Sequence, residues 1–235
     1  MTALLPPGAR RIAVCLLILC PIVVGAADAV VVMAPGAQQL ANAIDQAVMR
    51  AAGQDQYPLS LAAALGEKVE VAGLTVVLVG LCLAVGKLNG AALAAIAIPA
   101  APVITEYVLK PLFARPDADG SFPSGHTTAA FAMATVVSVL LVAPGTRVTG
   151  RWRLTIALAA LLAAAAVMVA VVGLGMHTVT DAAGGAAVGV GVALSVALLL
   201  DLPVAQRLLS VAAERICALA RRLRDGPSST TGPAG

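Results

Sequence analysis

Long, mostly apolar runs constrain this chain more than any other feature of its sequence. They lie at 12–34, 71–85, 91–109, 125–143, 154–176 and 182–202. A helix of roughly 20 apolar residues crosses the ~30 Å hydrocarbon core of a bilayer. Apolar residues make up 60% of the chain and charged residues 11%, whereas a soluble domain is about half apolar and a quarter charged. The sequence therefore predicts an all-α polytopic membrane protein, a bundle of six transmembrane helices.

The segments outside these runs predict two further helices and a tail. Residues 38–52 have the pattern of an amphipathic helix at the membrane surface. Residues 204–224 form a basic helix in this prediction, and the Gly-, Pro-, Ser- and Thr-rich residues 226–235 a disordered tail. We expect one membrane domain over residues 1–225. The first run also resembles a signal peptide with a small-residue cleavage site near Ala29, but its length favours a retained span.

Basic residues are distributed unevenly between the predicted loops. With six spans and a cytoplasmic N-terminus, the cytoplasmic side receives Arg10, Arg11, Lys87, Arg147, Arg151, Arg153, Arg207, Arg215, Arg221, Arg222 and Arg224. The other side receives only Arg50, Lys68, Lys110 and Arg115. Because basic loops stay in the cytoplasm, we expect a multi-pass plasma (inner) membrane protein with both termini cytoplasmic.

The composition gives no sign of nucleic acid, metal or a disulfide framework. Aromatic residues make up 3% of the chain, too few for a base-stacking platform. The four cysteines, Cys15, Cys20, Cys82 and Cys217, lack metal-ligand spacing. We therefore expect no cofactor, no metal and no nucleic-acid partner, and the oligomeric state stays open.

Polar residues gather at the outer ends of the predicted spans. The chain has two histidines, and the charge-based topology places both on the outer side. His126 opens the fourth span, His177 ends the fifth, and Lys110 ends the third, with Arg115 in the loop beyond. Asp181 follows His177 by four residues, one helical turn, so we expect the two side chains to meet on one face. The sequence predicts that these five groups converge at one membrane surface.

These residue types suit phosphoryl transfer. Lysine and arginine neutralise phosphate oxygens. Ser124 is a candidate helix N-cap, Gly125 lets the backbone approach closely, and a helix start binds anions. One imidazole can attack phosphorus and hold the phosphoryl group, oriented by a carboxylate on its other nitrogen. A second imidazole can protonate the leaving alkoxide.

Each residue also has a simpler structural interpretation. A histidine at a helix end is often solvated or capping, and Lys110 and Arg115 can extend to lipid headgroups. Asp181 can be the N-cap of the sixth span. The functional interpretation depends on the convergence of all five groups.

Three segments resemble the motifs of the type 2 phosphatidic acid phosphatase family. Pro123-Ser124-Gly125-His126 is similar to the second motif, and the segment from His177 to Asp181 to the third. Lys110 with Arg115-Pro116 resembles the first. The resemblance covers about residues 110–185, and the six-span layout agrees with it.

The resemblance implies a role for each candidate residue. His177 is then the nucleophile that forms a phosphohistidine, Asp181 orients it, and His126 is the general acid for the leaving group. The phosphate is then held by Lys110, Arg115, Ser124 and Gly125. Because the family needs no metal for catalysis, the resemblance implies a metal-independent phosphatase.

The sequence departs from the family pattern at two places. Four residues separate Lys110 from Arg115-Pro116 where the family has six, and Asp117 stands in the strict arginine position. The serine and arginine that precede the third-motif histidine are replaced by Ala170 and Val171. The loss of one charge-assisted contact in a transition-state site can cost ~10²–10³ in rate. Arg50 or Lys68 from the first outer loop is a candidate replacement.

We therefore expect a lipid-phosphate phosphatase with an extracytoplasmic active site, whose partners are a lipid-phosphate substrate and membrane lipid. Polyprenyl diphosphate, phosphatidate and similar lipids are all open as substrates. One alternative is a phosphotransferase of the same family, which gives the phosphoryl group to an alcohol or sugar. Another is a catalytically weak protein that binds or transports lipid.

Overall fold

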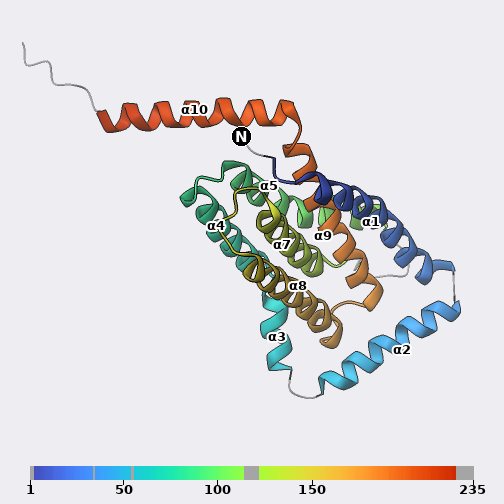
Figure 1. The fold of residues 1–235 in the computed structure, drawn as a ribbon. Coiled ribbons are helices and arrows are strands. Elements are labelled where there is room, and N and C mark those ends of the chain that lie inside the picture. Colours follow the sequence, from blue (N-terminus) through green and yellow to red (C-terminus); the bar gives the residue numbers. More distant parts are fainter. Residues whose placement is uncertain (1–2, 34, 54–55, 114–121, 226–235) are drawn as a thin grey trace, which may run out of the picture.

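Every regular element in the described part of the chain is a helix, as predicted. The computed structural model describes residues 3–33, 35–53, 56–113 and 122–225, and side chains are placed there except at 30–35 and 216–225. The helices, drawn in Figure 1, are α1 (Pro7–Met33), α2 (Pro35–Ala52), α3 (Tyr57–Ala64), α4 (Lys68–Ala84), α5 (Leu88–Ile104), the π-helical turn η1 (Thr105–Leu109), α6 (Lys110–Leu112), α7 (Gly125–Val142), α8 (Gly150–Gly173), α9 (Val179–Leu200) and α10 (Pro203–Asp225).

The expected number of six spans is not confirmed. Five helical stretches among the described residues are long and apolar enough to cross a membrane: Pro7–Ala29, Leu88–Leu112, Gly125–Val142, Gly150–Gly173 and Val179–Leu200. The predicted second span corresponds to α4, which has 17 residues, about 26 Å of helix at 1.5 Å per residue. The predicted tail at 226–235 lies outside the described residues.

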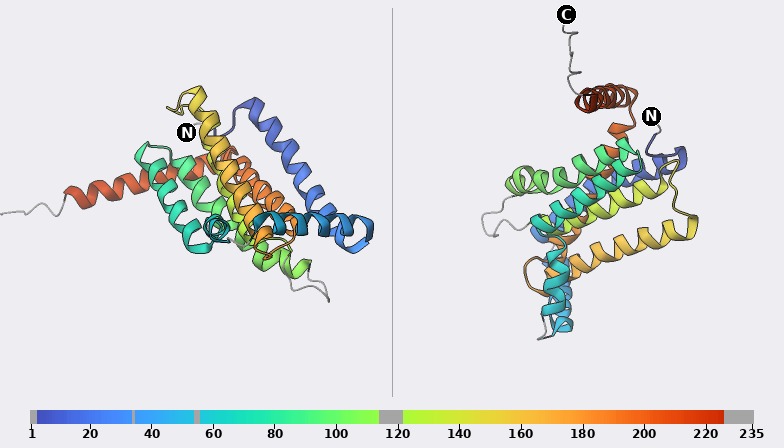
Figure 2. Two further views of the ribbon diagram at one scale, coloured as in Figure 1. Left: turned by 90° about the horizontal axis from the view of Figure 1, so that it is seen from below. Right: turned by 90° about the vertical axis from the view of Figure 1, so that its left-hand side faces the viewer.

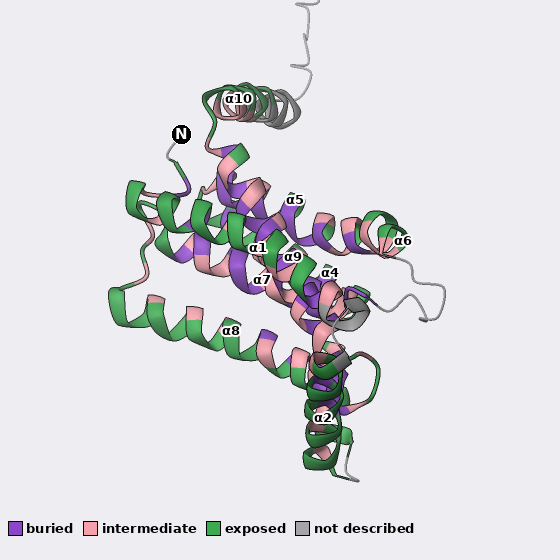
Figure 3. Cartoon of the chain, turned by 90° about the vertical axis from the view of Figure 1, so that its right-hand side faces the viewer, coloured by how far each residue is buried: buried purple, intermediate pink, exposed green. Residues whose placement is uncertain are grey.

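Helix α9 lies at the centre of the bundle. It packs against α7 on one side and α1 on another, and α7 in turn contacts α8 and α5. Helix α4 lies at the edge, against α5 (Figure 1). One buried apolar cluster joins α1, α5, α7 and α9 around Leu93, Ile98 and Val136, and a second joins α3, α7 and α8 around Val167 and Val171. The outer surface of α8 is exposed (Figure 3), as suits a helix that faces lipid.

Glycines on α9 allow α7 to approach very closely. A Cβ atom added to Gly185 would overlap the Ser124 carbonyl oxygen, and one added to Gly189 would overlap the Thr128 carbonyl oxygen. A Cβ atom on Gly184 would lie 2.6 Å from the Phe122 ring. Small residues at a helix interface let backbones touch in membrane proteins. Through this contact the start of α7 packs closely against the start of α9.

Two helices lie across opposite ends of the bundle. Figure 2 shows α2 at one end, with α3 beside it, and α10 at the other end, close to the N-terminus. The face of α2 that meets the bundle includes the buried residues Ala41 and Asp45, while most of the helix is exposed. Its bounds agree with the predicted surface helix, and those of α10 agree with the predicted basic helix.

The N-terminal segment is fastened to the end of α9. The backbone N–H groups of Leu4 and Leu5 donate to the Asp201 carboxylate at 2.6 and 3.0 Å, and Arg10 pairs with the same carboxylate at 3.4 Å. Asp201 is the C-cap residue of α9. The two ends of the membrane domain therefore meet on the side where α10 lies.

Candidate active site

The start of α7 has the cap that the sequence predicted. Ser124 is the N-cap, and its fully buried hydroxyl accepts hydrogen bonds from the Thr127 amide at 3.4 Å and the Thr127 hydroxyl at 3.1 Å. Serine caps a helix because its oxygen satisfies an N–H group that has no partner within the helix. Gly125 is the first helical residue, and His126 follows it.

A backbone hydrogen bond joins the two helix starts that carry the motifs. The Ser124 amide donates to the Asp181 carbonyl at 3.0 Å. This bond and the close packing of α7 on α9 bring the imidazole rings of His126 and His177 together, with ring centroids 6.2 Å apart and ring planes inclined by 61°. The two histidines of the chain therefore lie next to each other, at the starts of α7 and α9.

His177 lies beside Asp181, but not as residues on one helical turn. His177 precedes the helix, Thr178 is the N-cap of α9, and Asp181 is the third helical residue. The Thr178 hydroxyl accepts from the Asp181 amide at 3.2 Å, and the Asp181 carboxylate accepts from the Thr178 amide at 3.1 Å. This reciprocal pair is a capping box, so Asp181 is not the N-cap.

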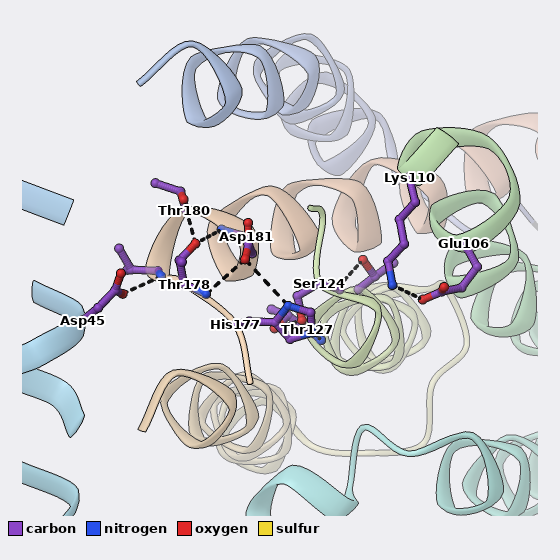
Figure 4. A network of polar contacts seen from close by, with 11 residues as sticks. Asp45, Glu106, Lys110, Ser124, Thr127, His177, Thr178, Thr180 and Asp181 are labelled. Atoms are coloured by element: carbon purple, nitrogen blue, oxygen red, sulfur yellow. Dashed lines mark hydrogen bonds and ion pairs between the residues drawn. The ribbon is translucent and has the colours of Figure 1, made fainter. Parts of the chain in front are cut away.

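The contact between His177 and Asp181 is longer than a hydrogen bond. His177 Nδ1 lies 3.7 Å from Asp181 Oδ2, and this buried nitrogen has no hydrogen-bond partner among the described residues. Figure 4 shows the ring facing the carboxylate. Catalytic hydrogen bonds are often long without substrate and shorten when it binds. The geometry therefore fits a carboxylate that orients the imidazole through Nδ1 and leaves Nε2 to react.

A second carboxylate, Asp45 of α2, reaches the same helix start. Its Oδ1 accepts from the Val179 amide at 2.7 Å, two residues from His177 (Figure 4). Burial raises the pKa of Asp45, the Val179 hydrogen bond opposes this shift, and the Asp181 charge adds to it. Asp45 thus ties the surface helix α2 to the start of α9.

His126 has an acidic partner of its own. Its Nε2 lies 3.0 Å from the Oε1 atom of Glu67, the N-cap residue of α4. The hydrogen bond with His126 is the main reason that the pKa of Glu67 is lowered. Burial of Glu67 opposes this shift.

An apolar cavity of about 500 Å³ opens beside His126. Its walls come from α4 and α5, including Val71, Val76 and Val103. Its polar lining residues are Glu67, Lys68, Thr75, Glu106, Tyr107 and His126. The cavity is thus apolar along α4 and α5 and polar near His126.

Comparisons with known proteins show the family to which the chain belongs. The family model of the PAP2 superfamily matches residues 75–202, more than half of the chain. The chain belongs to the PAP2 superfamily. This confirms the resemblance found in the sequence.

A solved PAP2 protein has the same fold. It is described as the first transmembrane PAP2 type phosphatidylglycerolphosphate phosphatase from Bacillus subtilis, and it aligns with a TM-score of 0.64 at 21% identity. The alignment covers 80% of this chain and 95% of that one. No curated protein matches the sequence significantly. The chain is therefore a membrane protein with the fold of the PAP2 phosphatases.

In the present chain, Lys110 lies on the other side of the α7 start from His177. Lys110 pairs with an acidic side chain. Its Nζ atom is 2.8 Å from Glu106 Oε1. A Cβ atom on Gly125 would lie 2.6 Å from the same Glu106 oxygen, so this carboxylate occupies the helix start where a phosphate would bind (Figure 4). The buried Thr105 hydroxyl, 3.2 Å from the Thr128 hydroxyl, fixes η1 and Glu106 against α7.

The structure places some of the other predicted phosphate-binding cations, and the residues that replace them, but not all. Arg115 and Asp117 lie outside the described residues. Ala170 and Val171, which replace the serine and arginine of the PAP2 third motif, are fully buried, and Val171 belongs to the apolar cluster around α8. Of the two candidate replacements, Lys68 lines the cavity with His126, whereas the Arg50 side chain donates to the Gln46 carbonyl of its own helix at 3.1 Å.

Sequence reasoning missed three acids of this site: Asp45, Glu67 and Glu106. Glu106 stands four residues before Lys110 on a predicted span, and that spacing is a usable signal for an ion pair. Glu67 and Asp45 lie in the first outer segment, and nothing in their local sequence indicates contacts with residues 126 and 179. Among the described residues, no group of three or more His, Cys, Asp or Glu side chains could hold a metal ion.

Proposed function

We propose that this PAP2 protein is an integral membrane phosphatase that hydrolyses a phosphomonoester or diphosphate of a lipid through a phosphohistidine on His177. The observation that carries the proposal is the pair of imidazoles 6.2 Å apart, one beside Asp181 and the other at the capped start of α7. A nucleophile, its orienting carboxylate and a proton donor are the groups that such a reaction requires.

In the proposed first step, His177 Nε2 attacks phosphorus, the bond from phosphorus to the leaving oxygen breaks, and His126 gives this oxygen its proton. Asp181 stabilises the positive charge on His177. In the second step, water attacks phosphorus and gives a proton to His126. The bond between phosphorus and His177 Nε2 breaks, and phosphate leaves. The N–H groups at the start of α7, with Ser124, Gly125, Lys110 and Arg115, hold the phosphate oxygens.

A lipid substrate is supported by the cavity between α4 and α5. Its apolar walls suit an acyl or prenyl chain, and its polar mouth includes His126. We propose that α4 also crosses the membrane, as the second of six spans in chain order, since its 17 residues reach the lower limit for crossing a bilayer. Six spans put both termini on one side, and the basic loops on that side support a cytoplasmic assignment. The active site is then extracytoplasmic.

A catalytically weak lipid-binding protein is a second candidate, because two features of the site oppose phosphate binding. Glu106 occupies the α7 start and pairs with Lys110. The third-motif arginine is replaced by the buried Val171. In this candidate the cavity holds lipid without turnover.

Phosphate release from a panel of lipid phosphates separates the two candidates. The purified full chain is assayed with phosphatidate, phosphatidylglycerol phosphate and a polyprenyl diphosphate, in the presence of EDTA. We expect release from at least one lipid, and losses of more than about 10³-fold in His177→Ala and about 10²–10⁴-fold in His126→Ala.

Trapping the intermediate tests the chemistry more directly. A radiolabelled phosphoryl group is expected on the wild-type chain in an acid-labile, base-stable form, and not on His177→Ala. Activity that His177→Ala retains would reject the phosphohistidine. Turnover abolished by EDTA and restored by a divalent cation would reject metal independence. Saturable lipid binding without release of phosphate from any lipid would favour the second candidate.

A further inference from the structure

The turn between α3 and α4 packs directly on His126. A Cβ atom added to Gly66 would lie 3.0 Å from the Cβ and carbonyl oxygen of His126, tighter than ordinary van der Waals contact. The turn is fixed by bonds from the Gly66 amide to the Ala63 carbonyl and from the Glu67 amide to the Ala64 carbonyl, both 2.9 Å. Glycine is therefore the residue that lets this turn come close enough for Glu67 to reach the ring.

The Glu67 side chain is directed to the imidazole and does not cap its own helix. Although Glu67 is the N-cap residue of α4, its side chain makes no capping hydrogen bond there. Its Oε1 atom lies 3.0 Å from His126 Nε2 instead. A carboxylate within hydrogen-bond distance stabilises the imidazolium over the neutral imidazole. A general acid must hold a proton before the leaving group departs.

We propose that Glu67 is a positioning residue that orients His126 through Nε2 and keeps it protonated for donation to the leaving oxygen. This inference rests on the proposed function. When the leaving bond breaks, the proton on Nδ1 passes to the leaving oxygen, and the proton on Nε2 stays hydrogen-bonded to Glu67. Glu67 thereby serves His126 as Asp181 serves His177, with a carboxylate on the nitrogen that does not react.

Other charged or titratable groups near His126 also affect its protonation. Lys68 and Glu106 line the same cavity, and the His177 ring lies 6.2 Å away. Lys110 pairs with Glu106, and Asp181 lies beside His177. Lys68 and a protonated His177 favour the neutral form of His126. Among the described residues, Glu67 is the group in hydrogen-bond contact with the His126 ring, so we expect its removal to outweigh changes in the other described groups.

The protonation of His126 can be followed directly, because the chain has two histidines. Histidine-selective NMR of the full chain in detergent gives two ring signals, and their assignment comes from His126→Ala and His177→Ala. In Glu67→Gln we expect the midpoint of the His126 titration to fall by about half to one pH unit, since the pair is partly exposed. Glu70→Gln, the same change one turn later on α4, is the matched control and should leave it unmoved.

The kinetic consequence follows the same direction. With the best lipid phosphate of the panel, the alkaline limb of kcat should move to lower pH by the same amount in Glu67→Gln and stay in place in Glu70→Gln. Glu67→Asp keeps the charge on a shorter side chain and should give an intermediate shift. If Glu67→Gln does not fold, the shift in Glu67→Asp tests the role of Glu67.

Two outcomes would overturn the inference. An unchanged His126 titration in Glu67→Gln would show that the carboxylate does not hold the proton. A shifted titration with an unmoved alkaline limb would show that the held proton is not the one donated. Failure of the proposed function is distinguishable, because it appears as a wild-type chain that releases no phosphate from any lipid, whatever the titration shows.

Discussion

At the residue scale, the site combines two imidazoles with four carboxylates, although carboxylates repel a phosphate. Asp45, Asp181, Glu67 and Glu106 all lie around the starts of α4, α7 and α9. Two of them contact the imidazoles, and Asp45 holds the backbone of α9. Glu106 instead pairs with Lys110. If Lys110 binds the substrate phosphate as proposed, Glu106 competes with it, so this acid has the clearest expected effect on affinity.

Glu106→Gln should strengthen substrate binding. The substitution keeps the shape of the side chain but removes the charge that pairs with Lys110. A partly exposed ion pair contributes ~1 kcal/mol or less, so KM for a lipid phosphate is expected to fall by about threefold to fivefold. Lys110→Ala should raise KM, and the double variant should show no gain from Glu106→Gln. A higher KM in Glu106→Gln would contradict this account.

The histidines and Ser124 could be predicted from sequence because their motifs carry the information locally. A Ser-Gly-His segment before an apolar run indicates a capped helix start, and the family resemblance pairs it with the segment from His177 to Asp181. The contact between Glu67 and His126 could not be predicted, since it depends on how the α3–α4 turn packs on α7. Nor could the sequence predict that His177 Nδ1 has no hydrogen-bond partner in the described part of the chain, where the Asp181 carboxylate bonds to the Thr178 amide in the capping box.

At the element scale, the glycine face of α9 holds the two motif-bearing helix starts together. The Gly185 Cα lies against the Ser124 carbonyl, and the Ser124 amide is bonded to Asp181. Any side chain at position 185 must therefore separate α7 from α9 at the level of the histidines.

Gly185→Ala should destabilise the protein and reduce its activity. Overpacking of a tight interface costs about 1–3 kcal/mol, and the added methyl group meets backbone, which cannot rotate away. Gly80→Ala on α4 is the matched control, because no atom lies within 4 Å of its added Cβ. It should be neutral or stabilising by about 0.5–1 kcal/mol. Thermal unfolding in detergent and phosphate release measure both effects, and equal stability of the two variants would contradict the packing argument.

Asp45 should make the docking of α2 depend on pH. Because burial raises its pKa, the folded protein binds this proton more tightly than the unfolded chain. Its contribution to stability therefore falls as pH rises from the ordinary carboxyl range toward neutrality. Asp45→Asn keeps an acceptor for Val179 without the charge, so its advantage in melting temperature over wild type should grow as pH rises above the ordinary carboxyl range.

Asp45→Ala separates the charge from the hydrogen bond. It leaves the Val179 amide without this acceptor, which should cost about 1–3 kcal/mol at every pH. A difference between Asp45→Asn and wild type that shrinks as pH rises would contradict the assignment.

Helix positions were predictable where hydrophobicity changes sharply, as at the starts of α7 and α9. The end of the third span was harder to predict. The helix continues from α5 through the π-helical turn η1, which ends at Leu109, into α6. Pro99 and Pro102 within α5 remove backbone donors just before η1. Helix α3 was missed because its eight residues are too short for a periodic signal.

At the scale of the whole molecule, the starts of α7 and α9, which carry the histidines, lie at the opposite end of the bundle from α10 and the N-terminal segment. Helices α2 and α3 flank the site, while α10 and the N-terminus lie at the other end (Figures 1 and 2). With a membrane between these ends, the two surface helices would contact different leaflets.

Cysteine labelling tests this arrangement. In a variant without the four native cysteines, Gln39→Cys on α2 and Ala212→Cys on α10 introduce thiols at exposed positions. A maleimide that cannot cross membranes should label position 39 in intact cells and position 212 only after permeabilisation. Labelling of both from the same side would contradict the proposed topology.

The hydrogen bonds from Leu4 and Leu5 to Asp201 span 197 and 196 residues of sequence. Because a chain is synthesised from its N-terminus, these leucines are made long before the aspartate, and the bonds can form only after α9 has been made. Until then α1 lacks α9, the helix that it contacts most. The pairing of α1 with α9 is therefore a late event in the assembly of the bundle.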